Sequence, residues 1–273
     1  MKIPSKYKDW AVIAIILISC VLTAVFDFVE LSVSDSEIYN KLVGNILPLL
    51  FGTLAVTLLV WRSGANLFQK PQKLLYIIPC LIIAVDNFPF AAYFAGKMQL
   101  LHTDAGHFLL FGLYCLFVGV FEELIFRGIV FQLLCERFSK DKRGLLKTYF
   151  LSSVLFGCMH LLNLFAGAGI GQTLLQVGYS TLTGGLFAFA LLKTKNILIP
   201  AATHALYNFC GLLFTAELGL GSGSVIDLPT ALVMLIVSLI ISVFVLYKTF
   251  TYPEEEREVL YSRLGIESPI ENK

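Results

Sequence analysis

Charged residues are scarce in this sequence. Only 14% of its 273 residues are charged, whereas soluble domains carry about a quarter. The 20 basic and 19 acidic residues leave a net charge of +1, so the basic surplus typical of nucleic-acid binding is missing. Apolar residues make up 57% of the chain, and the mean hydropathy of +0.80 is too high for a soluble enzyme or a disordered chain. The composition therefore predicts a membrane protein.

Closely spaced cysteines are also missing. The six cysteines form no CxxC pair, which argues against a disulfide framework or a cysteine-based zinc site. No clean signal-peptide cleavage site follows the apolar run that begins at Trp10, so we expect this run to be a retained first helix. With no long hydrophilic insert and no repeat, residues 1–273 are expected to form one membrane domain. Its short acidic cytoplasmic tail, 252–273, is expected to be a solvated helix or a frayed end.

Long apolar runs predict the fold class, because a helix needs about 20 apolar residues to cross a bilayer. We expect an all-α, polytopic membrane protein with about eight transmembrane helices and both termini in the cytoplasm. If the third run does not cross fully, the count is seven. The predicted spans are 10–27, 43–61, 74–94, 107–134, 147–163, 173–192, 197–215 and 229–249.

The basic residues support this topology. With a cytoplasmic N-terminus, seventeen of them lie on inner segments and only Lys41 and Lys97 lie on outer loops. Such an imbalance is what the positive-inside rule predicts. The remaining one, Arg127, lies within a span. We therefore expect an integral multi-pass protein, placed in the cell membrane if the source is bacterial, with the lipid bilayer as a partner and no nucleic acid.

Few ionisable side chains lie within the predicted spans, and each is a candidate functional residue because charge is costly inside lipid. Glu122, His160 and Asn208 lie on three different spans. At a helical rise of about 1.5 Å per residue, each lies about 20 Å from the inner end of its span. A similar depth on separate helices favours one shared site. The candidates are Asp86, Glu122, Glu123, Arg127, His160, His204 and the amide Asn208.

Most of these residues belong to three short motifs on separate predicted helices. The motifs are EExxxR at Glu122–Arg127, FxxxH at Phe156–His160 and HxxxN at His204–Asn208. The set resembles the CPBP family of intramembrane proteases, which includes the type II CAAX prenyl endopeptidases and proteins linked to bacteriocin immunity. The resemblance covers a motif-bearing core at about 106–213. It implies a glutamate-dependent endopeptidase that hydrolyses a peptide or membrane-protein substrate without a cofactor.

The resemblance also implies roles for these residues. Glu122 would be the general base, and His160 would help it hold and activate the attacking water. His204 and Asn208 would form the oxyanion hole. These residue types suit peptide hydrolysis, which needs a base for water, a proton donor for the leaving amine and hydrogen-bond donors for the oxyanion.

A structural role is open for other candidates. Glu123 and Arg127 lie four residues apart on one helix, so they can form a buried ion pair that fixes helix packing. The resemblance makes them the supporting pair of the site. Asp86 lies close to Pro89 and can satisfy a kinked backbone, which leaves its role open.

Three other functions remain as alternatives. The first is a zinc-dependent membrane metalloprotease, because two histidines (His160 and His204) and a glutamate can bind zinc, although no HExxH or other closely spaced ligand pair is present. The same polar cluster is compatible with a non-catalytic immunity or regulatory protein. A transporter is also conceivable, because intramembrane carboxylates and histidines form proton relays.

Overall fold

The computed structural model describes residues 32–138, 141–165, 167–215, 219–223 and 228–266, and these are mostly helical. A π-helical stretch, Leu124–Val130, joins α5 to α6, and 3-10 turns cover Leu74–Ile77 and His160–Leu164. The strands are β1 (Met98–Leu100) and β2 (Gly221–Gly223). The helices are α2 (Glu37–Arg62), α3 (Ile78–Asp86), α4 (Phe90–Phe94), α5 (Ala105–Glu123), α6 (Phe131–Phe138), α7 (Lys142–Met159), α8 (Ile170–Thr194), α9 (Leu198–Leu212), α10 (Leu228–Phe250) and α11 (Glu254–Leu264).

Among the described residues, five helical segments are long and apolar enough to cross a membrane, which confirms the helical membrane class. They are Glu37–Arg62, Ala105–Phe138, Lys142–Leu164, Ile170–Thr194 and Leu232–Phe250. The predicted first span, 10–27, lies outside the described residues. The total of eight spans and the cytoplasmic placement of the termini therefore stay predictions.

The predicted third span, 74–94, is not one continuous helix. The 3-10 turn leads into α3, which ends at Asp86, and α4 begins only at Phe90. Pro89 explains the break, since proline has no N–H and disfavours helical geometry in the residue before it. The Asn87 amide donates to the carbonyl oxygen of Tyr207 at 2.9 Å, so the break is tied to α9. Helix α9 is also shorter than predicted and ends at Leu212.

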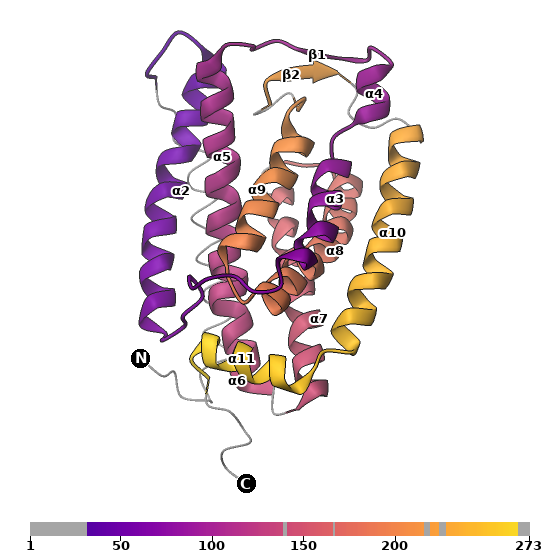
Figure 1. Cartoon of the computed structure of the whole chain (residues 1–273). Coiled ribbons are helices and arrows are strands. Elements are labelled where there is room, and N and C mark those ends of the chain that lie inside the picture. The colour runs from indigo at the N-terminus through magenta and orange to yellow at the C-terminus, as the bar shows by residue number, and fades with distance from the viewer. Residues whose placement is uncertain (1–31, 139–140, 166, 216–218, 224–227, 267–273) are drawn as a thin grey trace.

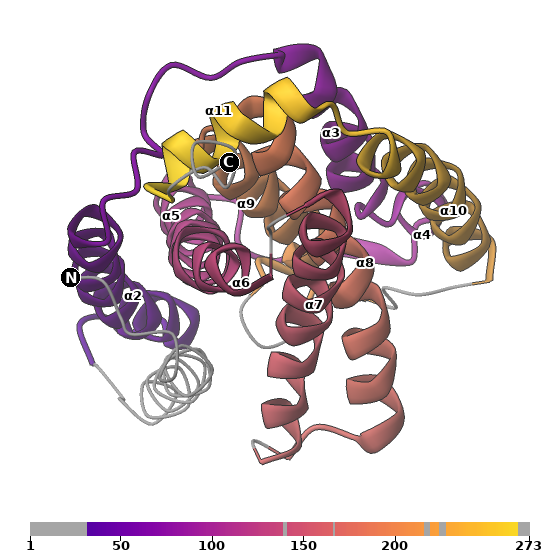
Figure 2. The same cartoon turned by 90° about the horizontal axis from the view of Figure 1, so that it is seen from below.

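Helix α9 lies among α5, α3 and α8, as Figures 1 and 2 show. Gly119 of α5 permits a close approach of α5 to α9. A Cβ atom at Gly119 would lie 2.7 Å from the nitrogen of Ala205 and 2.8 Å from the oxygen of Ala201. Small residues commonly allow backbones to approach in this way between membrane helices. The contact places the end of α5, with its two glutamates, beside α9.

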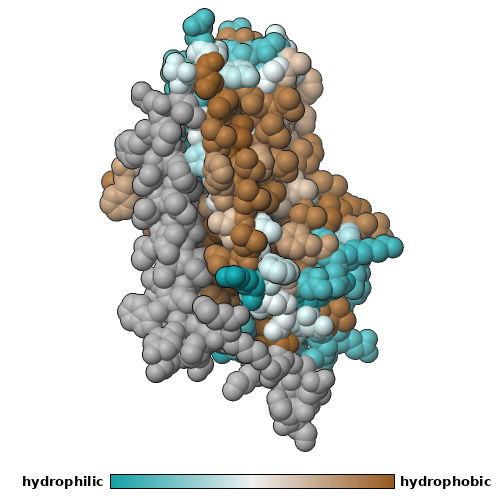
Figure 3. Space-filling view, turned by 90° about the vertical axis from the view of Figure 1, so that its left-hand side faces the viewer, coloured by the Kyte–Doolittle hydropathy of each residue, from teal (hydrophilic) through white to brown (hydrophobic). Residues whose placement is uncertain are grey.

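The two ends of the helical bundle differ in composition. At the lower end in Figure 1, α2 finishes at Arg62, α7 begins at Lys142 and α10 carries Lys248 in its last turn. At the upper end, β1 pairs antiparallel with β2. Between polar ends, one face shows a hydrophobic band in Figure 3. The basic helix ends thus share one side, which is the side predicted to face the cytoplasm.

The acidic tail contains a packed helix, in contrast to the expected solvated or frayed end. Helix α11 crosses the lower ends of the other helices (Figures 1 and 2) and buries Leu260, Tyr261 and Leu264. The side-chain amide of Gln132 donates to the carbonyl oxygen of Leu264 at 2.7 Å. The charge run predicted exposure, but the apolar residues interspersed with it dock the helix.

Candidate active site

The two glutamates end α5, and the π-helical stretch Leu124–Val130 follows them directly. All seven residues of this stretch are buried, including Arg127. A π-helix has wider i→i+5 hydrogen bonding than an α-helix and is frequent at functional sites. The EExxxR motif therefore lies where the backbone departs from regular α-helix, which the sequence pattern did not predict.

Glu123 and Arg127 form a fully buried ion pair. Nη1 of Arg127 donates to Oε1 of Glu123 at 2.8 Å, and neither side chain is exposed. Nη2 donates to the carbonyl oxygen of Gly184 on α8 at 2.6 Å. The guanidinium also lies 4.5 Å from the centre of the Phe156 ring. Arg127 thus fixes the carboxylate and holds α7 and α8 beside it.

His204 lies between the two glutamates. Its Nδ1 is 3.1 Å from Oε1 of Glu123, and its Nε2 is 3.8 Å from Oε2 of Glu122. An ionised carboxylate only accepts hydrogen bonds, so Nδ1 carries a proton that it donates to Glu123. The ring of Phe187 stacks on the imidazole at 4.7 Å between centroids. The structure therefore brings together motif residues from α5 and α9.

His160 joins this cluster through an aromatic side chain. The ring of Phe156 makes edge contacts with His160 at 5.8 Å and with His204 at 5.7 Å. His160 lies at the end of α7, where the chain turns into the 3-10 turn His160–Leu164. Asn208 is half-buried, one turn beyond His204 on α9. All three motifs thus contribute to one region.

The charges of the cluster limit its protonation. Two carboxylates, Glu122 and Glu123, share the region with the single guanidinium of Arg127. The guanidinium balances the charge of one carboxylate. Because an uncompensated charge is costly in a buried site, we expect one further proton to balance the second carboxylate. That proton can reside on Nε2 of His204 or on Glu122 itself.

Sequence reasoning missed several residues that shape this cluster. Gly184 binds Arg127, and a Cβ atom there would lie 2.9 Å from the Phe156 ring. Phe156 belongs to the FxxxH motif, but its packing between two histidines required the fold. Phe187 carries no motif signal at all. Asp86 is half-buried at the end of α3, and it is its neighbour Asn87 that bonds α9.

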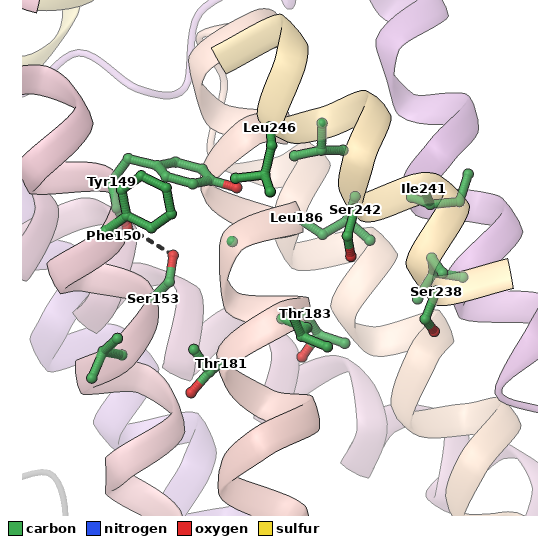
Figure 4. A pocket seen from close by; sticks show the side chains of 15 residues that line it. Tyr149, Phe150, Ser153, Thr181, Thr183, Leu186, Ser238, Ile241, Ser242 and Leu246 are labelled. Carbon is green, nitrogen blue, oxygen red and sulfur yellow. Dashed lines mark hydrogen bonds between the residues drawn. The ribbon is translucent and has the colours of Figure 1, made fainter. Parts of the chain in front are cut away.

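A separate pocket lies between α7, α8 and α10 (Figure 4). Its cavity is about 150 Å³ and includes none of the predicted site residues in its lining. The hydroxyl of Ser153 donates to the carbonyl of Tyr149 at 2.7 Å, and that of Thr181 donates to Val177 at 2.8 Å. These two hydroxyls bond their own helices, and the residues that line the pocket include no Asp, Glu, His, Lys or Arg to act as an acid or base in catalysis.

In the parts of the chain that the structure describes, no group of three or more His, Cys, Asp or Glu side chains is arranged to hold a metal ion. The alternative zinc set of His160, His204 and a glutamate therefore forms no such group among the described residues. That the protein acts without a cofactor stays a prediction.

The spanning helices define an integral, multi-pass membrane protein. Residues 104–210 match the family model described as Rce1-like, type II CAAX prenyl endopeptidase. The chain therefore carries an Rce1-like domain, in agreement with the resemblance stated above, and the matched segment includes all three motifs. Comparison with curated proteins found no match, and comparison with solved structures found none either.

Proposed function

We propose that this protein is an intramembrane endopeptidase that hydrolyses peptide bonds with a water molecule activated by Glu122. The observation that carries the proposal is the contact chain from Arg127 through Glu123 to His204, which ends beside Glu122. It lies within an Rce1-like domain. An otherwise costly cluster of buried charge in a membrane protein is explained if it performs chemistry.

In the proposed mechanism, Glu122 takes a proton from water while the water oxygen attacks the peptide carbonyl. His160 helps to hold that water. The tetrahedral oxyanion accepts hydrogen bonds from Nε2–H of His204 and from the Asn208 amide. Glu122 then gives its proton to the leaving amine as the carbon–nitrogen bond breaks.

Glu123 and Arg127 act through His204 in this mechanism. Glu123 accepts from Nδ1–H, so Nε2 is directed towards Glu122. With His204 protonated, two positive and two negative charges balance the cluster. Arg127 holds Glu123 in place and offsets its charge.

The name of the matched family points to substrates that end in a CAAX sequence whose cysteine is prenylated. We propose a peptide or membrane protein of this kind as the first substrate to test. The cleavage of an unmodified peptide should be compared with the cleavage of the same peptide in prenylated form. The apolar band of the bundle indicates that the protein lies in lipid, where a prenyl group would also hold the substrate.

The decisive experiment compares peptide termini in membranes from cells that express the wild type, Glu122→Gln or Glu255→Gln. Glu255 is an exposed residue of α11 and controls for the loss of a carboxylate. We expect new termini with the wild type and with Glu255→Gln, but not with Glu122→Gln. Identical termini in all three samples would contradict an enzymatic function. Cleavage that a chelator abolishes and zinc restores would contradict the metal-free mechanism.

A further inference from the structure

A second chain of polar contacts lies behind His160. The Asn163 amide donates from Nδ2 to Oε1 of Gln176 at 2.8 Å. Nε2 of Gln176 lies 3.3 Å from Nδ1 of His160. All three side chains are half-buried, and none of the three motifs includes Asn163 or Gln176. These contacts are independent of the chain from Arg127 to His204.

Local structure explains why the three side chains meet. His160 and Asn163 are three residues apart in a 3-10 turn, where residues at this spacing lie above one another. Gln176 lies on α8, which packs against this turn. The α7–α8 hairpin therefore places one amide beside the histidine and a second amide beside the first.

The direction of the hydrogen bonds fixes the proton on the imidazole. Because Asn163 donates to Oε1 of Gln176, the amide nitrogen of Gln176 faces His160. An amide nitrogen only donates, so Nδ1 of His160 must accept with its lone pair. A neutral imidazole has one bare nitrogen and one protonated nitrogen. The proton then resides on Nε2.

We propose that Gln176, oriented by Asn163, is a positioning residue that holds His160 as the neutral tautomer protonated on Nε2. The inference rests on the proposed function and sharpens it. His160 then offers a hydrogen-bond donor to the water oxygen and has no lone pair for the water proton. Of His160 and Glu122, only Glu122 can then accept the proton of the attacking water.

The test replaces Gln176 with Glu and with Leu. A glutamate at this position accepts hydrogen bonds, so we expect the proton of His160 to move to Nδ1 or both nitrogens to be protonated. Leu removes the donor, and we expect a mixture of tautomers. Gln172→Glu is the matched control, because Gln172 lies one turn earlier on α8 and is exposed.

The readout is the nitrogen chemical shift of ¹⁵N-labelled histidine in the full-length protein. The chain has only four histidines, and His160→Gln identifies the signals of His160. The proposal expects a bare Nδ1 and a protonated Nε2 in the wild type and in Gln172→Glu. A wild-type His160 protonated on Nδ1, or a tautomer unchanged in both Gln176 variants, would overturn it.

Kinetics supply a second readout. We expect Gln176→Glu to lower kcat roughly 10- to 100-fold, the range for outer partners that orient a functional histidine, while KM stays nearly constant. A proportional loss of folded protein without a change in kcat per folded molecule would indicate a merely structural role. If the wild type cleaves nothing, the proposed function fails, but the tautomer still decides this inference.

Discussion

Two histidines pair with a carboxylate through Nδ1, in very different surroundings. His204 contacts Glu123 in the middle of the bundle, and His107 contacts Asp104 at its upper end. The partner atoms are alike, and each ring has a second polar neighbour on Nε2. Because the paired atoms are alike, any difference between the two pairs comes from burial and from the neighbouring charges.

The pair at the upper end is structural. Asp104 caps α5 and its side chain is 61% exposed. Nε2 of His107 lies 3.1 Å from Oγ of Ser36, which caps α2. The backbone N–H of His107 and its ring hold the pKa of the Asp104 carboxyl below its usual range. Water screens this pair, so its contribution is to join two helix ends.

The buried pair has the features of a reactive site. Glu123 is not exposed and pairs with a guanidinium, and a second carboxylate lies beside the same imidazole. Electrostatic interactions are several times stronger away from water than at a surface. Burial and the additional charges therefore distinguish the candidate site from the helix-end clamp.

The largest expected difference concerns stability. Glu123→Gln leaves the buried Arg127 without its counter-charge, which should lower the free energy of unfolding by about 3–5 kcal/mol. Thermal unfolding in detergent measures the change. Asp104→Asn is the matched variant, and it should shift the midpoint far less, because asparagine also caps helices and the site is exposed. Equal shifts in the two variants would contradict the comparison.

The next difference concerns activity. His204→Gln should lower kcat about 10²–10³-fold, the usual effect of losing one oxyanion donor. His107→Gln should leave kcat within about twofold of the wild type, as for most substitutions away from the functional residues. The assay follows cleavage of a prenylated peptide in liposomes. A comparable loss in both variants would place the outer histidine in the function as well.

A third prediction tests whether the buried site depends on close helix packing. Gly119→Ala forces α5 and α9 apart and should destabilise the protein by about 1–3 kcal/mol. It should also lower kcat, because Glu122 moves relative to His204. Gly112→Ala on the same helix meets open space and should be neutral or stabilising, since alanine favours helix over glycine. Unfolding and cleavage assays on both variants check this, and equal behaviour would contradict the packing argument.

The smallest expected effect is a change of stability with pH that is caused by a buried charge at the lower end of the bundle. Burial lowers the pKa of the Lys195 ammonium to about 8, although Glu256 opposes the shift. Between pH 8 and 10 the unfolded chain therefore binds more protons at this group, so stability rises with pH. The rise is at most about 1.4 kcal/mol per pH unit.

Lys195→Met should remove this part of the rise and keep the rest of the curve. Unfolding midpoints at several pH values between 7 and 9.5 measure it. The same slope in the wild type and in Lys195→Met would show that the lysine does not carry the effect.

Much of the fold was predictable because hydropathy is a local property. The runs at 43–61, 107–134, 147–163, 173–192 and 229–249 each correspond to a helical segment, within the part of the chain that the structure describes, that is long and apolar enough to cross a membrane. The prediction of one continuous helix at 74–94 was wrong, because total hydropathy ignores how Pro89 and Asn87 interrupt a helix. For the acidic tail, 252–273, charge alone predicted an exposed segment. Three buried apolar residues instead dock helix α11 against the bundle.

The candidate site was predictable only in part. Spacing along one helix predicted the contact of Glu123 with Arg127, since residues four apart are neighbours. No local pattern predicts that Gly184 accepts from Arg127, because 57 positions separate the two residues. Nor does spacing reveal that Gln176 lies beside His160, since the contact depends on how α8 packs against the turn after α7.

The amino-acid sequence by itself determined the membrane class, the gathering of basic residues on one side and the identity of the polar residues placed in lipid. Each of these follows from short-range sums of hydropathy and charge. Only the tertiary structure decided which imidazole faces which carboxylate, where the backbone widens to a π-helix and which amide sets a proton. Those depend on contacts between helices distant in the chain, which packing alone creates.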